Sequence, residues 1–155
     1  MKKSVIFAIV VIYILAIVVV GFLGRKLTVP NPPVDVVNIK CTSDDYVAYN
    51  PDIASDKEWI DRGYAGKIEL NYEQNMRILL KCRIDPANAT QQDVDYISGN
   101  TQNGVVVKNE DGTAYLDILQ KGTFDVTIRA TDNKKTSIKI KIIITDEGGK
   151  VEGIV

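Results

Sequence analysis

The sequence contains no histidine, so it lacks the residue that most often acts as a general base or a metal ligand near neutral pH. A catalytic site would have to use carboxylates, lysines or a thiol alone, and no nucleophile motif is present. The loop pattern D-x-[DN]-x-[DN]-G of calcium sites is missing as well. We therefore expect no catalytic residues, no cofactor and no metal site, and a hydrolase is the least favoured function.

The sequence also lacks an excess of charge of either sign. It has 19 basic and 20 acidic residues, with a formal net charge of −1. Because nucleic-acid-binding proteins normally carry a concentrated basic face, we expect no nucleic-acid partner. Cysteine is scarce too: Cys41 and Cys82 are too few and too far apart for a zinc ribbon or a CxxC site. They form either one disulfide in an oxidising compartment or two buried thiols.

A long apolar run near the N-terminus contains no charged side chain. It extends from Ser4 to Leu23, and about twenty residues of helix span the roughly 30 Å hydrocarbon layer of a bilayer. A helix in a soluble core would show polar residues every third or fourth position, and this run does not show that pattern. We predict one transmembrane α-helix that contacts the lipid bilayer through residues 4–23.

The residues on either side of this run suggest its orientation. Two lysines precede it and Arg25 and Lys26 follow it, so the positive-inside rule is nearly balanced. Because everything that can fold follows the run, we place the N-terminus in the cytoplasm and the remainder outside, as in a signal-anchor. The alternative is a signal peptide cleaved near 19–21, which would give a secreted protein, but the run is long for a signal peptide and no A-x-A motif follows it.

After residue 34, apolar residues recur at every second position, which predicts β-strands with one buried and one solvated face. Four runs show this alternation clearly. The residues predicted to face inward are Val37, Ile39 and Cys41; Met76, Ile78, Leu80, Cys82 and Ile84; Phe124, Val126, Ile128 and Ala130; and Ile138, Ile140, Ile142 and Ile144. Both cysteines belong to this inward set, and a bridge between them would need Cα atoms within about 7 Å.

Turn-forming residues separate these runs. The sequence 110–112 predicts a hairpin between 105–107 and 115–118, Lys121-Gly122 precedes the strand that begins near Phe124, and 132–135 joins the last two strands. Short strands at this spacing favour an all-β sandwich of about a hundred residues.

Several short motifs follow one another in a fixed order over about residues 68–145. They are Leu80-x-Cys82-x-Ile84-x-Pro86, Ala87-Asn88-Ala89-Thr90, Val94-x-Tyr96-x-Ser98-x-Asn100, Leu116-Asp117-Ile118 and the run 121–128 before the isoleucine-rich last strand. Their order and spacing resemble a bacterial immunoglobulin-like domain, group 2, with Tyr96 where that family usually has tryptophan. The resemblance implies an immunoglobulin-like Greek-key β-sandwich, used on cell surfaces for adhesion, as a spacer or for carbohydrate contact. It carries no catalytic residue.

The segment 42–66 is longer than the corresponding link in that family. Exposed aromatic residues on such an insertion can anchor a partner. The candidate binding-loop residues are Tyr46, Tyr49, Trp59 and Tyr64. The alternative, which we favour, has Trp59 and Ile60 covering one end of the sandwich while the acidic residues of the insertion stay solvated.

Two smaller patterns predict local structure. Ser55 and Glu58 match a capping box, which would open one or two helical turns ending at Gly63. Charged residues near the last strand predict a basic sheet edge that blocks aggregation, or that contacts a membrane surface or a polyanion. These residues are Lys134, Lys135, Lys139 and Lys141.

These patterns divide the chain into a signal-anchor (1–26), a Pro-rich spacer (27–33), an immunoglobulin-like sandwich (34–146) with the insertion loop 42–66, and a flexible tail (147–155). We expect a single-pass cell-membrane protein whose extracytoplasmic domain is a binding or structural module for an unknown protein or a cell-wall glycan. The alternative is an accessory subunit of a membrane or cell-envelope assembly, with the helix packing through Gly21-x-x-Gly24.

Overall fold

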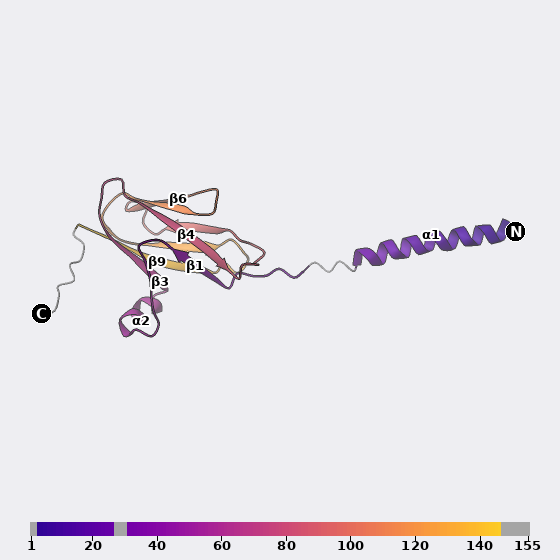
Figure 1. Ribbon diagram of the computed structural model, residues 1–155, viewed down its shortest axis with the longest axis horizontal. Coiled ribbons are helices and arrows are strands. Elements are labelled where there is room, and N and C mark those ends of the chain that lie inside the picture. Colours follow the sequence, from indigo (N-terminus) through magenta and orange to yellow (C-terminus); the bar gives the residue numbers. More distant parts are fainter. Residues whose placement is uncertain (1–2, 27–30, 147–155) are drawn as a thin grey trace. The chain divides into compact units, whose positions relative to one another are not determined.

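The computed structural model describes residues 3–26 and 31–146, so the predicted tail and part of the predicted spacer lie outside the described residues. The chain divides into two compact units, residues 1–32 and residues 33–155. In the first unit, α1 (Lys3–Lys26) is one continuous helix, as predicted (Figure 1). The span Lys3–Gly21 is long and apolar enough to cross a membrane, and none of it is buried. This helix is a candidate membrane anchor or signal sequence.

The second unit consists of two β-sheets around one core, which confirms the all-β prediction (Figure 1). The four-stranded sheet has the order β1 (Asn38–Thr42), β4 (Arg77–Asp85), β7 (Ala114–Ile118) and β6 (Gly104–Lys108). The five-stranded sheet has the order β2 (Tyr46–Ala48), β3 (Tyr64–Asn71), β9 (Ser137–Thr145), β8 (Gly122–Ala130) and β5 (Val94–Ser98). Neighbouring strands are antiparallel except β3 and β9, which are parallel.

The inward residues of both sheets form the core, and most of the predicted ones are buried. Those that the structure confirms as buried are Ile39, Cys41, Ile78, Leu80, Ile84, Phe124, Val126, Ile128, Ala130, Ile140, Ile142 and Ile144. Met76, Cys82 and Ile138 are half-buried and pack against the same core. Since burying one such aliphatic side chain contributes about 1.5–3 kcal/mol, this shared core is what holds the two sheets together.

Val37 is the exception, because its side chain is 74% exposed and the prediction that it faces inward is wrong. The residue buried instead is its neighbour Val36, which is 1% exposed. The backbone N–H of Val36 donates a hydrogen bond to Oδ2 of Asp132 at 3.0 Å, and β1 begins only at Asn38. The alternation within β1 therefore does not extend back to the residues before it.

The predicted turns are confirmed. β6 and β7 form an antiparallel hairpin, and Gly112 in its turn has φ of 82°, which a residue with a side chain rarely adopts. β8 and β9 are also paired antiparallel. In the turn between them, the N–H of Lys135 donates to Oδ1 of Asp132 at 2.9 Å.

The last strand does not lie at a sheet edge, so the predicted basic edge is wrong. β9 lies between β3 and β8 in the five-stranded sheet. The error arises because β3 pairs with β9 in parallel across a long sequence separation, and turn residues reveal only pairs of consecutive strands. Lys139 and Lys141 instead alternate with buried Ile140 and point away from the core.

The insertion 42–66 contains β2, a short helix α2 (Ala54–Asp61) and the start of β3. The helix ends at Asp61, two residues before the predicted end at Gly63, which follows the C-cap residue Arg62 and has φ of 84°. The capping-box prediction is wrong: the N-cap residue is Ile53, with no side-chain cap, and Ser55 is already inside the helix. Glu58 pairs with Arg62 one turn later, at 2.5 Å.

Candidate functional site

Three of the four predicted aromatic residues meet on the outer face of the five-stranded sheet. The rings of Tyr49 and Trp59 are stacked, with centroids 6.2 Å apart and an angle of 11° between planes. The ring of Tyr64 meets Trp59 edge-on, with centroids 5.9 Å apart and an angle of 67°. We call Tyr49, Trp59 and Tyr64 the aromatic cluster. It brings together β3, α2 and the segment between β2 and α2. In Figure 1, α2 is drawn just below β3.

The outward lysines of β9 complete this cluster. Nζ of Lys141 lies 4.4 Å from the ring centroid of Trp59 and 4.9 Å from that of Tyr64. Nζ of Lys139 lies 5.0 Å from the ring of Tyr64, and the guanidinium of Arg62 lies 5.3 Å from the ring of Trp59. A cation over an aromatic ring contributes about 0.5–1 kcal/mol at exposed sites. The half-buried Trp59 is thus surrounded by groups of its own chain.

A hydrogen bond ties the cluster to β8. The hydroxyl of Tyr64 donates to Oδ1 of Asp125 at 2.6 Å, and Nζ of Lys139 lies 3.9 Å from the other oxygen of that carboxylate. Burial, followed by the hydrogen bond to Asp125, raises the pKa of Tyr64 to about 12. The insertion is therefore fastened across β3, β9 and β8, on the outer face of the sheet rather than at an end of the sandwich.

Tyr46 lies apart from the aromatic cluster, on the inner side of the sheet. It packs against the core, and its hydroxyl donates to the carbonyl oxygen of Ala65 at 3.0 Å. A Cβ added to Gly66 would lie 2.5 Å from the Tyr46 ring, so glycine leaves the space that this ring fills. Burial raises the pKa of Tyr46 to about 12.

The Tyr49 hydroxyl is buried, with no hydrogen-bond partner among the described residues. Burial is the largest cause that raises the pKa of this phenol.

Cys41 and Cys82 face each other as direct partners in the antiparallel pair β1–β4, and both are free thiols in this structure. Cys41 is buried and Cys82 is half-buried. The contact with the Cys82 sulfur, followed by burial, raises the pKa of the Cys41 thiol well above its usual range. Tyr96 lies beside Cys82, and its hydroxyl donates to the carbonyl oxygen of Gly112 at 2.9 Å.

A polar cluster that the sequence did not indicate fixes the point where the chain joins the domain. The N–H of Val34 donates to Oγ1 of Thr90 at 2.8 Å, and the hydroxyl of Thr136 donates to the carbonyl of Val36 at 3.1 Å. Asp132, only 8% exposed, accepts from Val36 as described above. We call Thr90, Asp132 and Thr136 the junction clamp. Sequence reasoning identified Asp132 only as a turn residue.

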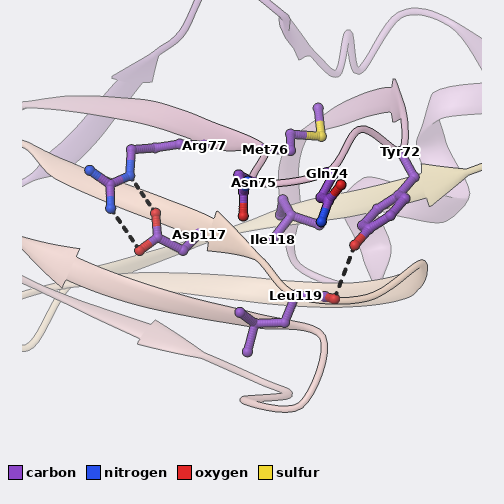
Figure 2. A pocket seen from close by; sticks show the side chains of 8 residues that line it. All are labelled: Tyr72, Gln74, Asn75, Met76, Arg77, Asp117, Ile118 and Leu119. Atoms are coloured by element: carbon purple, nitrogen blue, oxygen red, sulfur yellow. Dashed lines mark hydrogen bonds and ion pairs between the residues drawn. The ribbon is translucent and has the colours of Figure 1, made fainter.

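A pocket with a volume of about 670 Å³ lies where β4 begins and β7 ends (Figure 2). The residues that line it are Tyr72, Gln74, Asn75, Met76, Arg77, Asp117, Ile118 and Leu119. Nε and Nη2 of Arg77 bind the two carboxylate oxygens of Asp117 at 2.5 and 3.0 Å, and this pairing lowers the pKa of Asp117. The carboxylate at this pocket is thus already neutralised by a neighbouring arginine, and no sequence motif pointed to it.

Neither the aromatic cluster nor this pocket assembles a metal site. Within residues 3–26 and 31–146, no three side chains of histidine, cysteine, aspartate or glutamate converge. The aromatic cluster offers ring faces and ammonium groups, which suit packing or contact with a partner.

No family model matches the sequence, and no curated protein matches it, so the resemblance to the group 2 immunoglobulin-like domains stays a prediction. Among solved structures, the chain is similar to domains 4 and 5 of the S-layer protein SbsC, with 11% identity over 68% of this chain and 47% of that one, and a TM-score of 0.39. It is also similar to a structure of domains 1–6 of the surface layer protein SbsC, with 15% identity over 52% of this chain and 12% of that one, and a TM-score of 0.38. The chain thus spans less than half the length of either structure, and similarity at this level carries no functional argument.

Proposed function

We propose that this protein is a membrane-tethered, non-catalytic immunoglobulin-like module that is displayed outside the cytoplasm. The observation that carries the proposal is the contrast between the two units of the chain. α1 has an apolar surface with none of its span buried, whereas the β-domain buries its own apolar residues in one core. A lipid bilayer would cover the apolar surface of α1, whereas the β-domain needs no bilayer to cover its apolar residues.

The strand order supports the immunoglobulin-like Greek key. Constant-type immunoglobulin domains have strands A, B, E and D in one sheet and C, F and G in the other. The order β1-β4-β7-β6 corresponds to A-B-E-D, and the order β9-β8-β5 corresponds to G-F-C. In this assignment β3 continues the first strand in the other sheet, and the insertion 42–66 is an elaboration between its two halves.

The junction clamp supports a positional mechanism. Because Thr90, Asp132 and Thr136 hold the backbone of residues 34 and 36, the segment that enters the domain is attached to it at a fixed place. Lys134 adds an ion pair with Asp35 at 3.0 Å. In the proposed mechanism the helix sets the location, the sandwich is a rigid frame, and its loops contact a protein or a cell-wall glycan.

The proposal is tested by making the full chain in a bacterial host and treating intact spheroplasts with trypsin, which can cut after Arg25 and Lys26. We expect trypsin to cut the chain in intact spheroplasts and release the β-domain from the membrane, while a cytoplasmic protein stays whole. Before proteolysis, the chain should resist extraction from membranes at alkaline pH, and its mass should include α1.

Two outcomes would overturn the proposal in different ways. If trypsin cuts the chain only after the cells are lysed, the β-domain faces the cytoplasm. If the chain is soluble outside the cytoplasm and its mass lacks the residues before Gly21, the helix is a cleaved signal sequence and the protein is secreted.

A further inference from the structure

The two cysteines have the geometry that a disulfide needs. Cys41 is the direct partner of Cys82 in the β1–β4 pair. Directly opposed residues of antiparallel strands have Cα atoms about 4.5–5.5 Å apart, which lies within the range of about 4.4–6.8 Å that disulfides span. Ile39 and Ile84, each two residues away along its strand, are both buried. The cysteine side chains therefore leave the sheet on the same inner face, where their sulfurs contact each other.

The surroundings favour a structural bond over a reactive thiol pair. The contact between the two sulfurs, followed by burial, raises the pKa of the Cys41 thiol, and the same contact lowers the pKa of Cys82. A reactive redox cysteine is accessible as well as low in pKa, whereas Cys41 is 4% exposed and Cys82 is half-buried. Cys82 is half-buried beside Tyr96, and the described residues bring no third metal-ligating side chain to the pair. A metal site or a catalytic thiol is therefore disfavoured.

We infer that Cys41 and Cys82 are a disulfide site, and that the bond locks β1 to β4 once the chain meets a disulfide oxidant. The inference rests on the proposed function for where this happens, since such oxidants act outside the cytoplasm. One cysteine thiolate attacks the external disulfide and forms a mixed disulfide, which the second cysteine then resolves. The two cysteine protons and two electrons end on the two thiols of the reduced oxidant. The burial of Cys41 requires this exchange to occur before β1 closes onto the domain.

The bond would act on the edge strand that follows the tether. β1 is an edge strand with β4 as its one neighbour in the sheet, and it directly follows the segment held by the junction clamp. A disulfide would join β1 to β4 covalently, so that a pull on the tether could not separate the two strands. The bond also closes a loop of roughly 40 residues, which restricts the unfolded chain. That loop contains the insertion 42–66 and β3.

The decisive test uses the full chain in detergent micelles, unfolded and reduced, then refolded with oxidised glutathione. Alkylation under denaturing conditions and mass spectrometry report whether the chain has lost two hydrogens. We expect nearly complete oxidation within one chain, and a melting temperature that drops by roughly 10 °C when a reductant is added. The double variant C41V/C82V keeps the apolar filling and should melt at a temperature that does not depend on reductant. Dimers linked between chains, free thiols, or a melting temperature that does not fall on reduction would overturn the inference.

A second measurement separates this inference from the proposed location. The cysteines of the chain in spheroplasts are trapped with a maleimide after denaturation, with and without reduction, alongside the trypsin assay. Thiols blocked until reduction, in a chain that trypsin reaches from outside, support both proposals. Free thiols in such a chain overturn the disulfide. If the domain is in the cytoplasm but the purified chain oxidises as expected, the location fails and the disulfide site stands.

Discussion

α1 and β9 are two apolar runs of similar residue types that have opposite environments. In α1, side chains such as Ile12 and Tyr13 are 66% and 69% exposed, whereas Ile140 and Ile142 of β9 are fully buried. β9 places Lys139 and Lys141 on its other face, and α1 contains no charged residue from Ser4 to Leu23. The comparison teaches that the spacing of charged residues, and not the share of apolar residues, distinguishes the two kinds of run. A run with charges on one face is buried by its own domain, and a run without charges needs an apolar environment outside the chain.

The largest effect is expected where the chain covers its own apolar run. Ile142→Asp would place a carboxylate at a position with no exposure, between the two sheets. Burying an unpaired charge there would cost more free energy than the whole unfolding free energy of a domain, about 5–15 kcal/mol. The β-domain should therefore lose its cooperative melting. Circular dichroism during heating measures this. The control Ile143→Asp, on the outward half-buried side of the same strand, should still melt cooperatively.

The matching change in α1 should affect the membrane and not the fold. Ile12→Lys places a charge at the middle of the apolar span and should weaken insertion by about 2.5–3.5 kcal/mol, roughly 100-fold. The fraction of chain that resists alkaline extraction from membranes measures this, with Ile12→Leu as the control. The melting of the β-domain should be the same in both variants. Unchanged membrane association of the lysine variant would mean that α1 is not held by a bilayer.

The core was predictable because its signal is local. Alternation with period two placed Ile140, Ile142 and Phe124 inside, and runs of turn-forming residues marked the β6–β7 and β8–β9 hairpins. The exception, Val37, follows from a long-range hydrogen bond between Val36 and Asp132, which the sequence around β1 cannot reveal. The position of β9 was missed for the same kind of reason, since its partner β3 is parallel and far away along the chain.

The candidate site was predictable only as a set of residue types. The sequence pointed to Tyr49, Trp59 and Tyr64, but not to Lys141, because the contact depends on the β3–β9 pairing. The alternation of Ile68 and Leu70 with polar residues is a signal that could have indicated β3. Tyr46 belongs to the same insertion but faces inward, because the strand β2 sends alternate side chains to opposite faces.

A smaller loss of stability is expected when the aromatic cluster on the outer face of β9 is disrupted. Trp59→Ala removes both ring contacts and the contact with Lys141, which should destabilise the β-domain by about 1–3 kcal/mol. Urea unfolding of the full chain in micelles measures this, and Trp59→Phe, which keeps a ring, should recover most of the loss. If Trp59→Ala kept the stability of the original chain but lost binding to immobilised peptidoglycan, Trp59 would be a contact residue for a partner and not a fastening for the insertion.

The smallest effect concerns the hydroxyl of Tyr64 at high pH. The pKa of this phenol is raised from 10.0 to about 12 in the folded domain, so the folded state holds the proton more tightly than the unfolded state does. Its contribution to stability is complete below pH 10 and is lost as the pH rises from 10 to about 12. The original chain should therefore lose stability more steeply in this window than Tyr64→Phe, as measured by urea midpoints at several pH values. Tyr46, whose pKa is also about 12, is present in both chains and cancels in the comparison. If the urea midpoints of the two chains fell in parallel with pH, water would reach the Tyr64 hydroxyl freely. The insertion would then not cover the outer face of the sheet in the way that the core covers its inner face.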